Sequence, residues 1–545
     1  MDAYNFNRNF SKVYIIKEVC IMSKFDAVVI GSGTGGLSAA LSLATAGKKV
    51  LLLEQHNLPG GCASSFVRGR FEFDASLHEF CSVGYPGHWG LTGKLLMEKY
   101  KLNPEWVLIP DLYRCIGTTR SGRHIDVTMP CGKQNFIDKM EELVPGSRKA
   151  METFFELTEE CNEAYNYFND HLHDGLDKNG FTYVDEGLFM KKYPNFLKVA
   201  EYPFNVVLRK IGMPEDAIDI LNIYWTYIGT DYERLSFVHQ AWMLLMYIEY
   251  HPAICKKTAH GFTMSGIERL RELGGELWLN TKALEVKADE NGKIQGVETT
   301  AGFVETNYVI ANMNPQDAYT KLLSKNIKVP EREIKRANIE KHGLRFFNAY
   351  VALNKSVDEL GIKDYTIFMP GSFDTKQNYA YSKDYELNTH SVVVIYNVVD
   401  PEASPEGTTL MTFTIAYTED MWGDFDQREY VSKKQQLFRK VMENFENDTG
   451  IIIHDCIEEI ELASPWTFCN FLGTPQGTVY GYECSEWDTM VSRLLTMRKE
   501  QPIHGFKTCG ASGARGDGYN QTYLNGDDMA QLLLMDMAED EKEGK

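Results

Sequence analysis

Three glycines near the start of the chain and one acidic residue downstream have the spacing of a dinucleotide-binding turn. Gly31, Gly33 and Gly36 form the pattern G-x-G-x-x-G, and Glu54 follows about 20 residues later. In such a turn the first glycine permits a tight bend, the second lets the backbone approach a pyrophosphate, and the third allows close helix packing. Glu54 is placed to accept hydrogen bonds from an unphosphorylated ribose, which favours FAD or NAD. Ser32, inside the turn, is a further candidate for cofactor binding.

The residues around the turn predict a strand, a helix and a second strand in register. The apolar run FDAVVI ends just before Gly31, an Ala- and Leu-rich helical stretch ends near Gly47, and KKVLLLE ends at Glu54. The amides and the dipole at the start of this helix would face phosphate groups. We therefore expect an α/β unit that holds a dinucleotide.

A loop after Glu54 favours FAD over NAD. Gly60 and Gly61 form a pair, small polar residues including Ser64 follow, and Phe73-Asp74 closes the segment. This pattern resembles the FAD-dependent phytoene desaturase, carotenoid isomerase and retinol saturase family, which shares the flavin-binding architecture of amine oxidases. The resemblance implies that the loop runs beside the FAD pyrophosphate. Cys62 and Ser76 depart from the family pattern.

Two later segments carry the same resemblance. In the segment that starts at His260, the family position matched by Ala283 places its backbone against the adenine. Near the C-terminus, Gly510, Gly516 and Gly518 match the glycines of an isomerase-type ending. A helix beginning near Gly518 would direct its dipole at the flavin N1–C2=O edge. Ala511 replaces the usual Asp, so we expect weakened FAD affinity.

These matches predict an α/β fold with a discontinuous Rossmann-like FAD-binding domain and an inserted α+β substrate-binding domain. The boundaries that we expect are 22–110, 255–315 and 490–540 for the FAD-binding domain and 111–254 and 316–489 for the substrate-binding domain. Residues 1–21 form an N-terminal extension, since the first core strand begins near Phe25 and Met22 is a suitable start. The apolar stretch AWMLLMYIEY is too short to span a membrane and predicts a buried helix.

Composition narrows the classes of partner. A formal net charge of -20 argues against nucleic-acid binding, which needs clustered Lys and Arg. The 11 cysteines include no C-x-x-C pair, so we expect reduced thiols in a cytoplasmic protein, with peripheral membrane association left open. No metal-ligand cluster is visible in the sequence.

The resemblance implies an FAD-dependent oxidoreductase or isomerase that exchanges hydride at flavin N5 with carbon–carbon double bonds. Its substrate would be long and apolar, either a carotenoid-like polyene or an unsaturated fatty acid, and a net redox reaction would need an external electron carrier. Two alternatives stay open: a non-enzymatic lipid-binding protein like the Rab GDP-dissociation inhibitors, and an amine oxidase-like enzyme. No catalytic residue can be assigned. His78 is a candidate proton donor or a structural histidine, and Arg515 is either an anion ligand or a structural residue.

Overall fold

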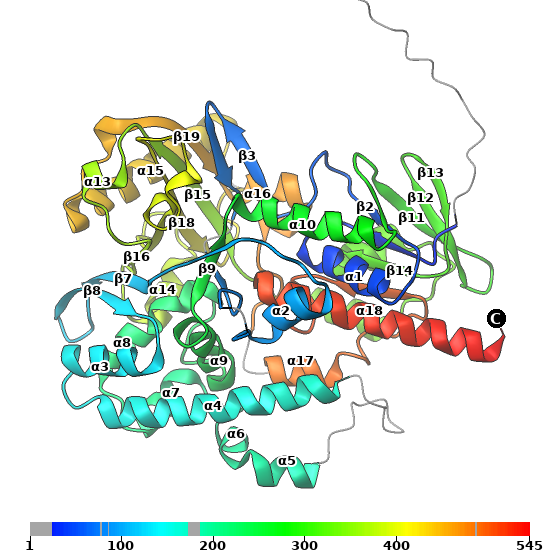
Figure 1. Cartoon of the computed structure of the whole chain (residues 1–545), viewed down its shortest axis with the longest axis horizontal. Coiled ribbons are helices and arrows are strands. Elements are labelled where there is room, and N and C mark those ends of the chain that lie inside the picture. Colours follow the sequence, from blue (N-terminus) through cyan, green and yellow to red (C-terminus); the bar gives the residue numbers. More distant parts are fainter. Residues whose placement is uncertain are drawn as a thin grey trace, which may run out of the picture.

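The structure is a computed structural model that describes residues 24–76, 79–85, 87–172, 186–423, 425–484 and 488–544. The predicted N-terminal extension 1–21 and the candidate proton donor His78 lie outside the described residues. The fold is mixed α/β, as the sequence predicts (Figure 1).

A five-stranded parallel sheet forms the base of the dinucleotide unit. Its order is β10-β2-β1-β14-β20, so strands from three distant segments of the chain lie side by side. The strands are β1 (Ala27–Ile30), β2 (Val50–Leu53), β10 (Glu276–Trp278), β14 (Val309–Asn312) and β20 (Phe506–Cys509). Strands β1 and β2 are apolar throughout and almost fully buried, as expected for a parallel sheet covered on both faces. The predicted discontinuity of the Rossmann-like fold is therefore present.

Helices cover one face of this sheet, and a small antiparallel sheet covers the other. The helices are α1 (Thr34–Thr45), α10 (Thr258–Glu272) and α18 (Gly518–Glu543). Ala27 and Val29 of β1 pack towards these helices, whereas Val28 packs towards β11 (Ala283–Ala288), β12 (Ile294–Thr299) and β13 (Gly302–Glu305). Helix α1 follows the glycine turn and ends just before Gly47, which has a φ of +78°, so the predicted strand–helix–strand unit is confirmed.

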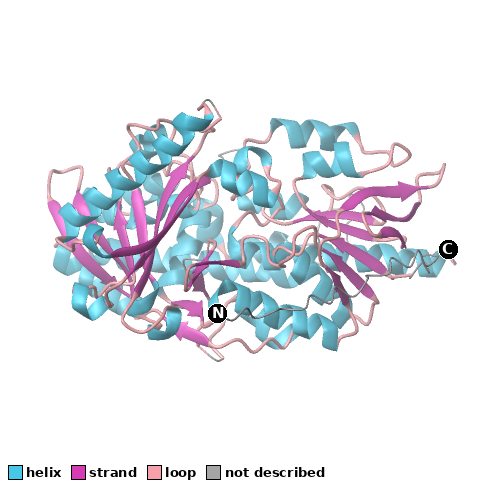
Figure 2. Ribbon diagram, turned by 90° about the horizontal axis from the view of Figure 1, so that it is seen from above, coloured by secondary structure: helices cyan, strands magenta, loops and turns pink. Residues whose placement is uncertain are grey.

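A seven-stranded mixed sheet lies at the other end of the molecule, on the left in Figures 1 and 2. Its order is β19-β15-β18-β17-β16-β7-β8, with β7 (Asp111–Thr118), β8 (His124–Pro130), β15 (Arg345–Leu353), β16 (Thr366–Met369), β17 (Ser391–Ile395), β18 (Thr409–Tyr417) and β19 (Ile457–Ala463). Strands from the two segments predicted as inserts thus form one sheet. Helix α15 (Gln427–Thr449) packs on one face through Leu437, Val441 and Phe445.

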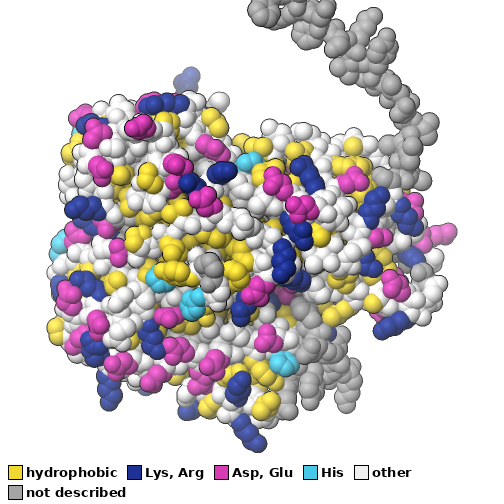
Figure 3. Space-filling model, in the orientation of Figure 1, with side chains coloured by type: hydrophobic (Ala, Val, Ile, Leu, Met, Phe, Trp, Pro, Cys, Tyr) yellow, Lys and Arg dark blue, Asp and Glu magenta, His cyan; other side chains and the backbone are white. Residues whose placement is uncertain are grey.

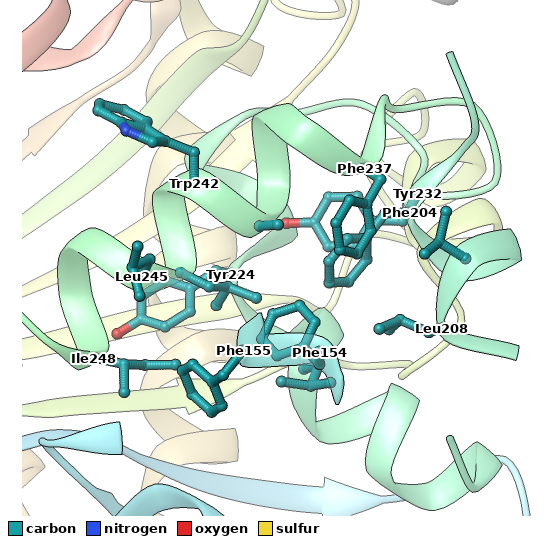
Figure 4. Packing of buried hydrophobic residues seen from close by; sticks show 14 of the residues in the cluster. Phe154, Phe155, Phe204, Leu208, Tyr224, Tyr232, Phe237, Trp242, Leu245 and Ile248 are labelled. Carbon is teal, nitrogen blue, oxygen red and sulfur yellow. The ribbon is translucent and has the colours of Figure 1, made fainter. Parts of the chain in front are cut away.

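An aromatic helical layer lies beside this sheet. It contains α3 (Lys133–Leu143), α4 (Arg148–His171), α5 (Glu186–Lys192), α6 (Pro194–Val199), α7 (Phe204–Lys210), α8 (Glu215–Leu221) and α9 (Phe237–Ile248). Rings of Phe154, Phe204 and Phe237 meet at centroid distances of 5.8–6.2 Å (Figure 4). The stretch AWMLLMYIEY forms most of α9, so the predicted buried helix is confirmed.

Short strands join the two ends of the molecule. Strand β9 (Pro252–Cys255) pairs with β5 (Phe80–Cys81) and β6 (Trp106–Leu108). A hairpin of β3 (Ser65–Arg68) and β4 (Phe71–Asp74) ends at the Phe-Asp pair of the family motif. The remaining short helices are α2 (Leu91–Gly93), α11 (Pro315–Asp317), α12 (Glu331–Ile339), α13 (Val357–Leu360), α14 (Thr375–Tyr381), α16 (Pro465–Leu472) and α17 (Met490–Thr496).

The surface carries charges of both signs. Figure 3 shows Lys, Arg, Asp and Glu side chains spread over one face, with hydrophobic side chains gathered near its middle. Within the described ranges, no helix is both long and apolar enough to cross a membrane.

Candidate functional site

One large cavity of about 830 Å³ connects the dinucleotide unit to the seven-stranded sheet. Its wall includes the carboxyl ends of the parallel strands, where ligands bind in open α/β sheets, and residues of α9, β15 and β18. Its volume lies in the upper part of the range of about 300–1,000 Å³ that is typical of ligand sites. We refer to the part lined by the parallel sheet and β11 as the dinucleotide half, and to the part lined by α9, β15 and β18 as the substrate half.

The glycine turn shapes the dinucleotide half. Gly31 has a φ of +87°, and a Cβ on Gly36 would lie 1.9 Å from the carbonyl oxygen of Gly31, so both positions require glycine. Helix α1 begins after Gly33 with no side chain capping its first turn. Its first amides and the positive end of its dipole are therefore available to an anion such as a pyrophosphate.

The carboxylate of Glu54 is fixed at the end of β2. Its Oε2 accepts hydrogen bonds from the Ser32 amide at 3.0 Å and from the Ser32 hydroxyl at 2.6 Å, and its Oε1 accepts one from the His56 amide at 2.9 Å. Glu54 lines the cavity, and a carboxylate has lone pairs for about four hydrogen bonds. The held carboxylate therefore has acceptor capacity left for a ribose diol.

Asn312 is a site residue that the sequence patterns did not reveal. It ends β14, and its side chain lies where a Cβ on Gly33 would be 2.8 Å from Nδ2 and a Cβ on Gly510 would be 2.4 Å from Oδ1. The two glycine segments can meet around Asn312 only because both lack side chains there. A polar residue at the end of an otherwise apolar parallel strand is the signal that could have identified it.

The N-terminus of α18 is a second helix start at the cavity. Gly518 has a φ of +80°, Asp517 precedes it, and no side chain caps the first turn. The Tyr519 hydroxyl donates to the Cys62 carbonyl at 3.0 Å and lies 3.0 Å from the Ser76 hydroxyl, which ties α18 to the loop after Gly61. The residues at which this chain departs from the family pattern, Cys62 and Ser76, thus both line the cavity.

Arg515 has a structural role. Its side chain is 2% exposed and forms a two-pronged ion pair with Asp528, with nitrogen–oxygen distances of 2.7 and 3.0 Å. It also donates to Tyr165 and Asn169 of α4 at 2.8 Å each. Because four of its five N–H donors are used within the protein and its side chain does not line the cavity, Arg515 is not an anion ligand of the cavity.

The predicted cofactor-binding residues divide into a cavity wall and the layer behind it. The wall includes Gly31, Gly33, Glu54, Gly61, Ala283, Gly510, Ala511 and Gly518. Behind the wall lie Ser32, Gly36, Gly60 and Ser64, which hold the wall in place. For example, the Gly60 amide donates to the Ser32 hydroxyl at 3.2 Å, and the Ser64 hydroxyl donates to the Gly61 carbonyl at 2.8 Å.

The substrate half is mainly aromatic and apolar, with Asn348 and Thr414 among its polar residues. Its wall includes Tyr227, Ile228, Trp242, Met243, Met246, Tyr247, Phe346, Val479 and Tyr480. In Figure 4, Trp242 points away from the packed rings of the helical layer. Burial raises the pKa of the Cys62 thiol to about 11 and that of Cys81 to about 12, and it also raises the pKa of Cys509, so these three cavity cysteines stay protonated at neutral pH.

The titratable groups of the substrate half are uncharged near neutral pH. Burial raises the pKa of Glu79 to about 8 and that of Asp517 to about 8. Burial also lowers the pKa of His239 to about 4 and lowers that of His342. Carboxyl groups therefore tend to keep their protons here, and the histidines tend to stay neutral.

Comparisons with known proteins agree with the geometry. Residues 29–95 match the model of an NAD(P)-binding Rossmann-like domain. The chain is 22% identical over 526 residues to the all-trans-retinol 13,14-reductase of Danio rerio, covering 90% of this chain and 84% of the relative. It is 25% identical over 476 residues to the chloroplastic prolycopene isomerase of Daucus carota, covering 84% of this chain and 72% of that relative.

Solved structures of low identity share the fold. A putrescine oxidase variant superposes with a TM-score of 0.60 at 13% identity, covering 94% of this chain and 99% of that one. An oxidoreductase from Methanosarcina mazei superposes with a TM-score of 0.59 at 11% identity, covering 92% of this chain and 99% of that one. The relatives support an enzyme, an oxidoreductase or isomerase, over the non-enzymatic lipid-binding alternative. Together these findings support the resemblance of the chain to the FAD-dependent flavoprotein family of phytoene desaturases, carotenoid isomerases and retinol saturases.

Proposed function

We propose that the cavity binds FAD and that the enzyme transfers hydride between flavin N5 and a carbon–carbon double bond of an uncharged polyene. The observation that carries the proposal is the continuity of the cavity, which runs from Glu54 and the glycine turns to the aromatic wall of α9. Bound FAD supplies the two-electron chemistry. The predicted division into a FAD-binding domain (22–110, 255–315, 490–540) and a substrate-binding domain (111–254, 316–489) is part of this proposal.

The chain's own residues have distinct tasks in this proposal. The amides at the start of α1 bind the pyrophosphate, and Glu54 accepts hydrogen bonds from the ribose. The dipole of α18 stabilises negative charge on the reduced flavin ring. Trp242, Met246 and Tyr247 bury the apolar substrate and exclude water from the reacting carbons. An external electron carrier resets the flavin if the reaction is a net reduction or oxidation.

Charge in the cavity favours an uncharged substrate over a fatty acid. The described wall contains two lysines, Lys282 and Lys321, and both belong to the dinucleotide half, beside Ala283 and β11. In the described part of the substrate half, the basic side chains are His239 and His342, whose pKa values burial lowers. A carboxylate would therefore lose its hydration without gaining a cation.

The binding of FAD is tested with the purified protein and a Glu54→Gln variant. The wild type should bind added FAD, measured by quenching of flavin fluorescence. The variant should bind about 1–3 kcal/mol more weakly, the range for a hydrogen bond to a charged group. Glu276→Gln is the matched control, because its exposed carboxylate accepts a hydrogen bond from Trp278 on the same sheet. Equal affinity of the Glu54 variant and the wild type would contradict the assigned ribose contact.

The substrate class is tested with two polyenes that differ at one end. All-trans-retinol and all-trans-retinoic acid share a chain, but the acid carries a carboxylate at pH 8. We expect the FAD-loaded enzyme to bind retinol at least about tenfold more tightly, about 1.4 kcal/mol, because a buried charge without a partner is unfavourable. Binding is measured by quenching of tryptophan fluorescence. Tighter binding of the acid would instead favour a fatty-acid-like substrate.

A further inference from the structure

Glu79 is a buried carboxyl at the junction of the two halves of the cavity. Its residue is 6% exposed, it lines the cavity, and it immediately precedes β5. The ring of Phe80 stacks on Tyr519 at 5.9 Å, and the Asn520 side chain donates to the Cys81 carbonyl at 3.2 Å. Glu79 thus lies beside the first turn of α18, the helix start assigned to the flavin ring, and faces the substrate half.

One carboxyl oxygen of Glu79 is used and the other is free for a ligand. The Tyr227 hydroxyl donates to Oε1 at 2.9 Å, whereas Oε2 is buried and has no hydrogen-bond partner among the described residues. A buried polar atom without a hydrogen-bond partner lowers the stability of the fold, so its presence calls for an explanation such as a contact with a ligand. The orphaned oxygen is therefore the atom from which a proton can reach a bound molecule.

Burial among uncharged groups keeps Glu79 protonated. Its electrostatic neighbours are Tyr224, Tyr227, Tyr247, Tyr365, Cys81 and Cys131, and burial raises the pKa of every one of them. Two effects act on Glu79 itself: burial raises its pKa, to about 8, while the Tyr227 hydrogen bond lowers it by a smaller amount. A carboxylic acid that titrates near the working pH is suited to general acid catalysis.

Resting on the proposed function, we propose that Glu79 is a catalytic acid that gives its proton to one carbon of the substrate double bond. Reduced flavin would supply the hydride for the C–H bond at the other carbon, and the π electrons would form the second C–H bond with the proton from Glu79. The substrate gains two electrons and two hydrogens, and the flavin loses two electrons. Glu79 is left as a carboxylate, stabilised by the Tyr227 hydroxyl, and takes a new proton from solvent.

The other titratable groups of the cavity fit this task less well. His239 is neutral near pH 7, since burial lowers its pKa to about 4, so it has no proton to give as an imidazolium. Asp517, before the first turn of α18, also tends to keep its proton, since burial raises its pKa to about 8, so the Asp517→Asn variant is needed to separate the two acids. Glu79 fits the task better because it keeps its proton, its Oε2 has no hydrogen-bond partner among the described residues, and aromatic side chains surround it.

The experiment compares the wild type, Glu79→Gln, Asp517→Asn and the exposed control Glu98→Gln. A readout independent of turnover is the infrared band of a protonated carboxyl group. We expect this band in the purified wild type at pH 7 and expect it to disappear as pH rises through about 8. Glu79→Gln should lose the part of the band that belongs to Glu79, whereas the part that Asp517→Asn removes should remain. The catalytic readout is a single turnover, in which photoreduced enzyme is mixed with all-trans-retinol and flavin reoxidation is followed.

Glu79→Gln should bind FAD and retinol like the wild type but reoxidise its flavin about 10²–10⁴-fold more slowly, the usual contribution of a general acid. Glu98→Gln should match the wild type. A wild type that binds neither FAD nor retinol overturns the proposed function and this role together. A wild type that turns over, with Glu79→Gln equally fast, overturns only the role of Glu79. The role of Glu79 is also overturned if Glu79→Gln loses affinity for retinol but keeps the rate of flavin reoxidation. It is overturned as well if only Asp517→Asn slows flavin reoxidation.

Discussion

Replacing Arg515 by Met should lower the free energy of unfolding by about 3–5 kcal/mol. The substitution leaves the Asp528 carboxylate, 3% exposed, without the cation that neutralises it. It also removes the hydrogen bonds that join the turn before α18 to Tyr165 and Asn169 of α4. The loss is measured by urea denaturation followed by tryptophan fluorescence.

Two companion variants separate the buried pair from a general effect of losing an arginine. Arg209→Met removes partly exposed pairs with Glu233 and Glu215 and should lose no more than about 1 kcal/mol. Arg515→Met combined with Asp528→Leu should be more stable than Arg515→Met alone, because the buried negative charge is then removed together with its counter-ion. A loss below about 1 kcal/mol for Arg515→Met would contradict the structural role and reopen the question of an anion ligand.

The wild type should lose stability relative to Glu79→Gln as pH rises from about 4.5 to about 8. Burial raises the pKa of Glu79 from 4.5 to about 8 in the folded protein. In this window the unfolded chain releases the proton while the folded protein keeps it, so ionisation favours unfolding. At about 1.4 kcal/mol per unit, the full shift corresponds to at most about 5 kcal/mol.

The sign of this effect distinguishes a protonated acid from an ion-paired carboxylate. A carboxylate held by a cation would have a lowered pKa, and its contribution would be lost as pH falls instead. The measurement is the difference in urea midpoint between the wild type and Glu79→Gln from pH 4 to pH 9, with Glu98→Gln as the control that should follow the wild type. A difference that is constant with pH would show that Glu79 ionises as readily in the folded protein as in the unfolded chain.

Local signals in the sequence were sufficient for the dinucleotide unit. The turn at Gly31, the end of α1 before Gly47 and the position of Glu54 after β2 depend on backbone conformation and short-range spacing, which a single sequence carries directly. The apolar stretch within α9 was identifiable as a buried helix for the same reason. The domain boundaries and the cofactor contacts themselves stay predictions.

Contacts between residues far apart in the sequence could be identified only from the tertiary structure. Asn312 is a single polar residue at the end of the apolar strand β14. It lies beside Gly31, Gly33 and Gly510 only because β1, β14 and β20 lie side by side. The partners of Arg515 are 13 residues away in α18 and about 350 residues away in α4, so spacing could not choose between an anion ligand and a structural residue.

The sequence by itself determined the strand–turn–helix–strand unit and predicted its dinucleotide ligand, since both rest on glycines and an acid at fixed short distances. Only the tertiary structure decided the character of the substrate half. Whether Glu79 keeps its proton depends on burial beside Tyr227 and α18, and the scarcity of cations there depends on where Lys282 and Lys321 come to lie. Desolvation and charge proximity are properties of the folded chain, because residues far apart in the sequence create them.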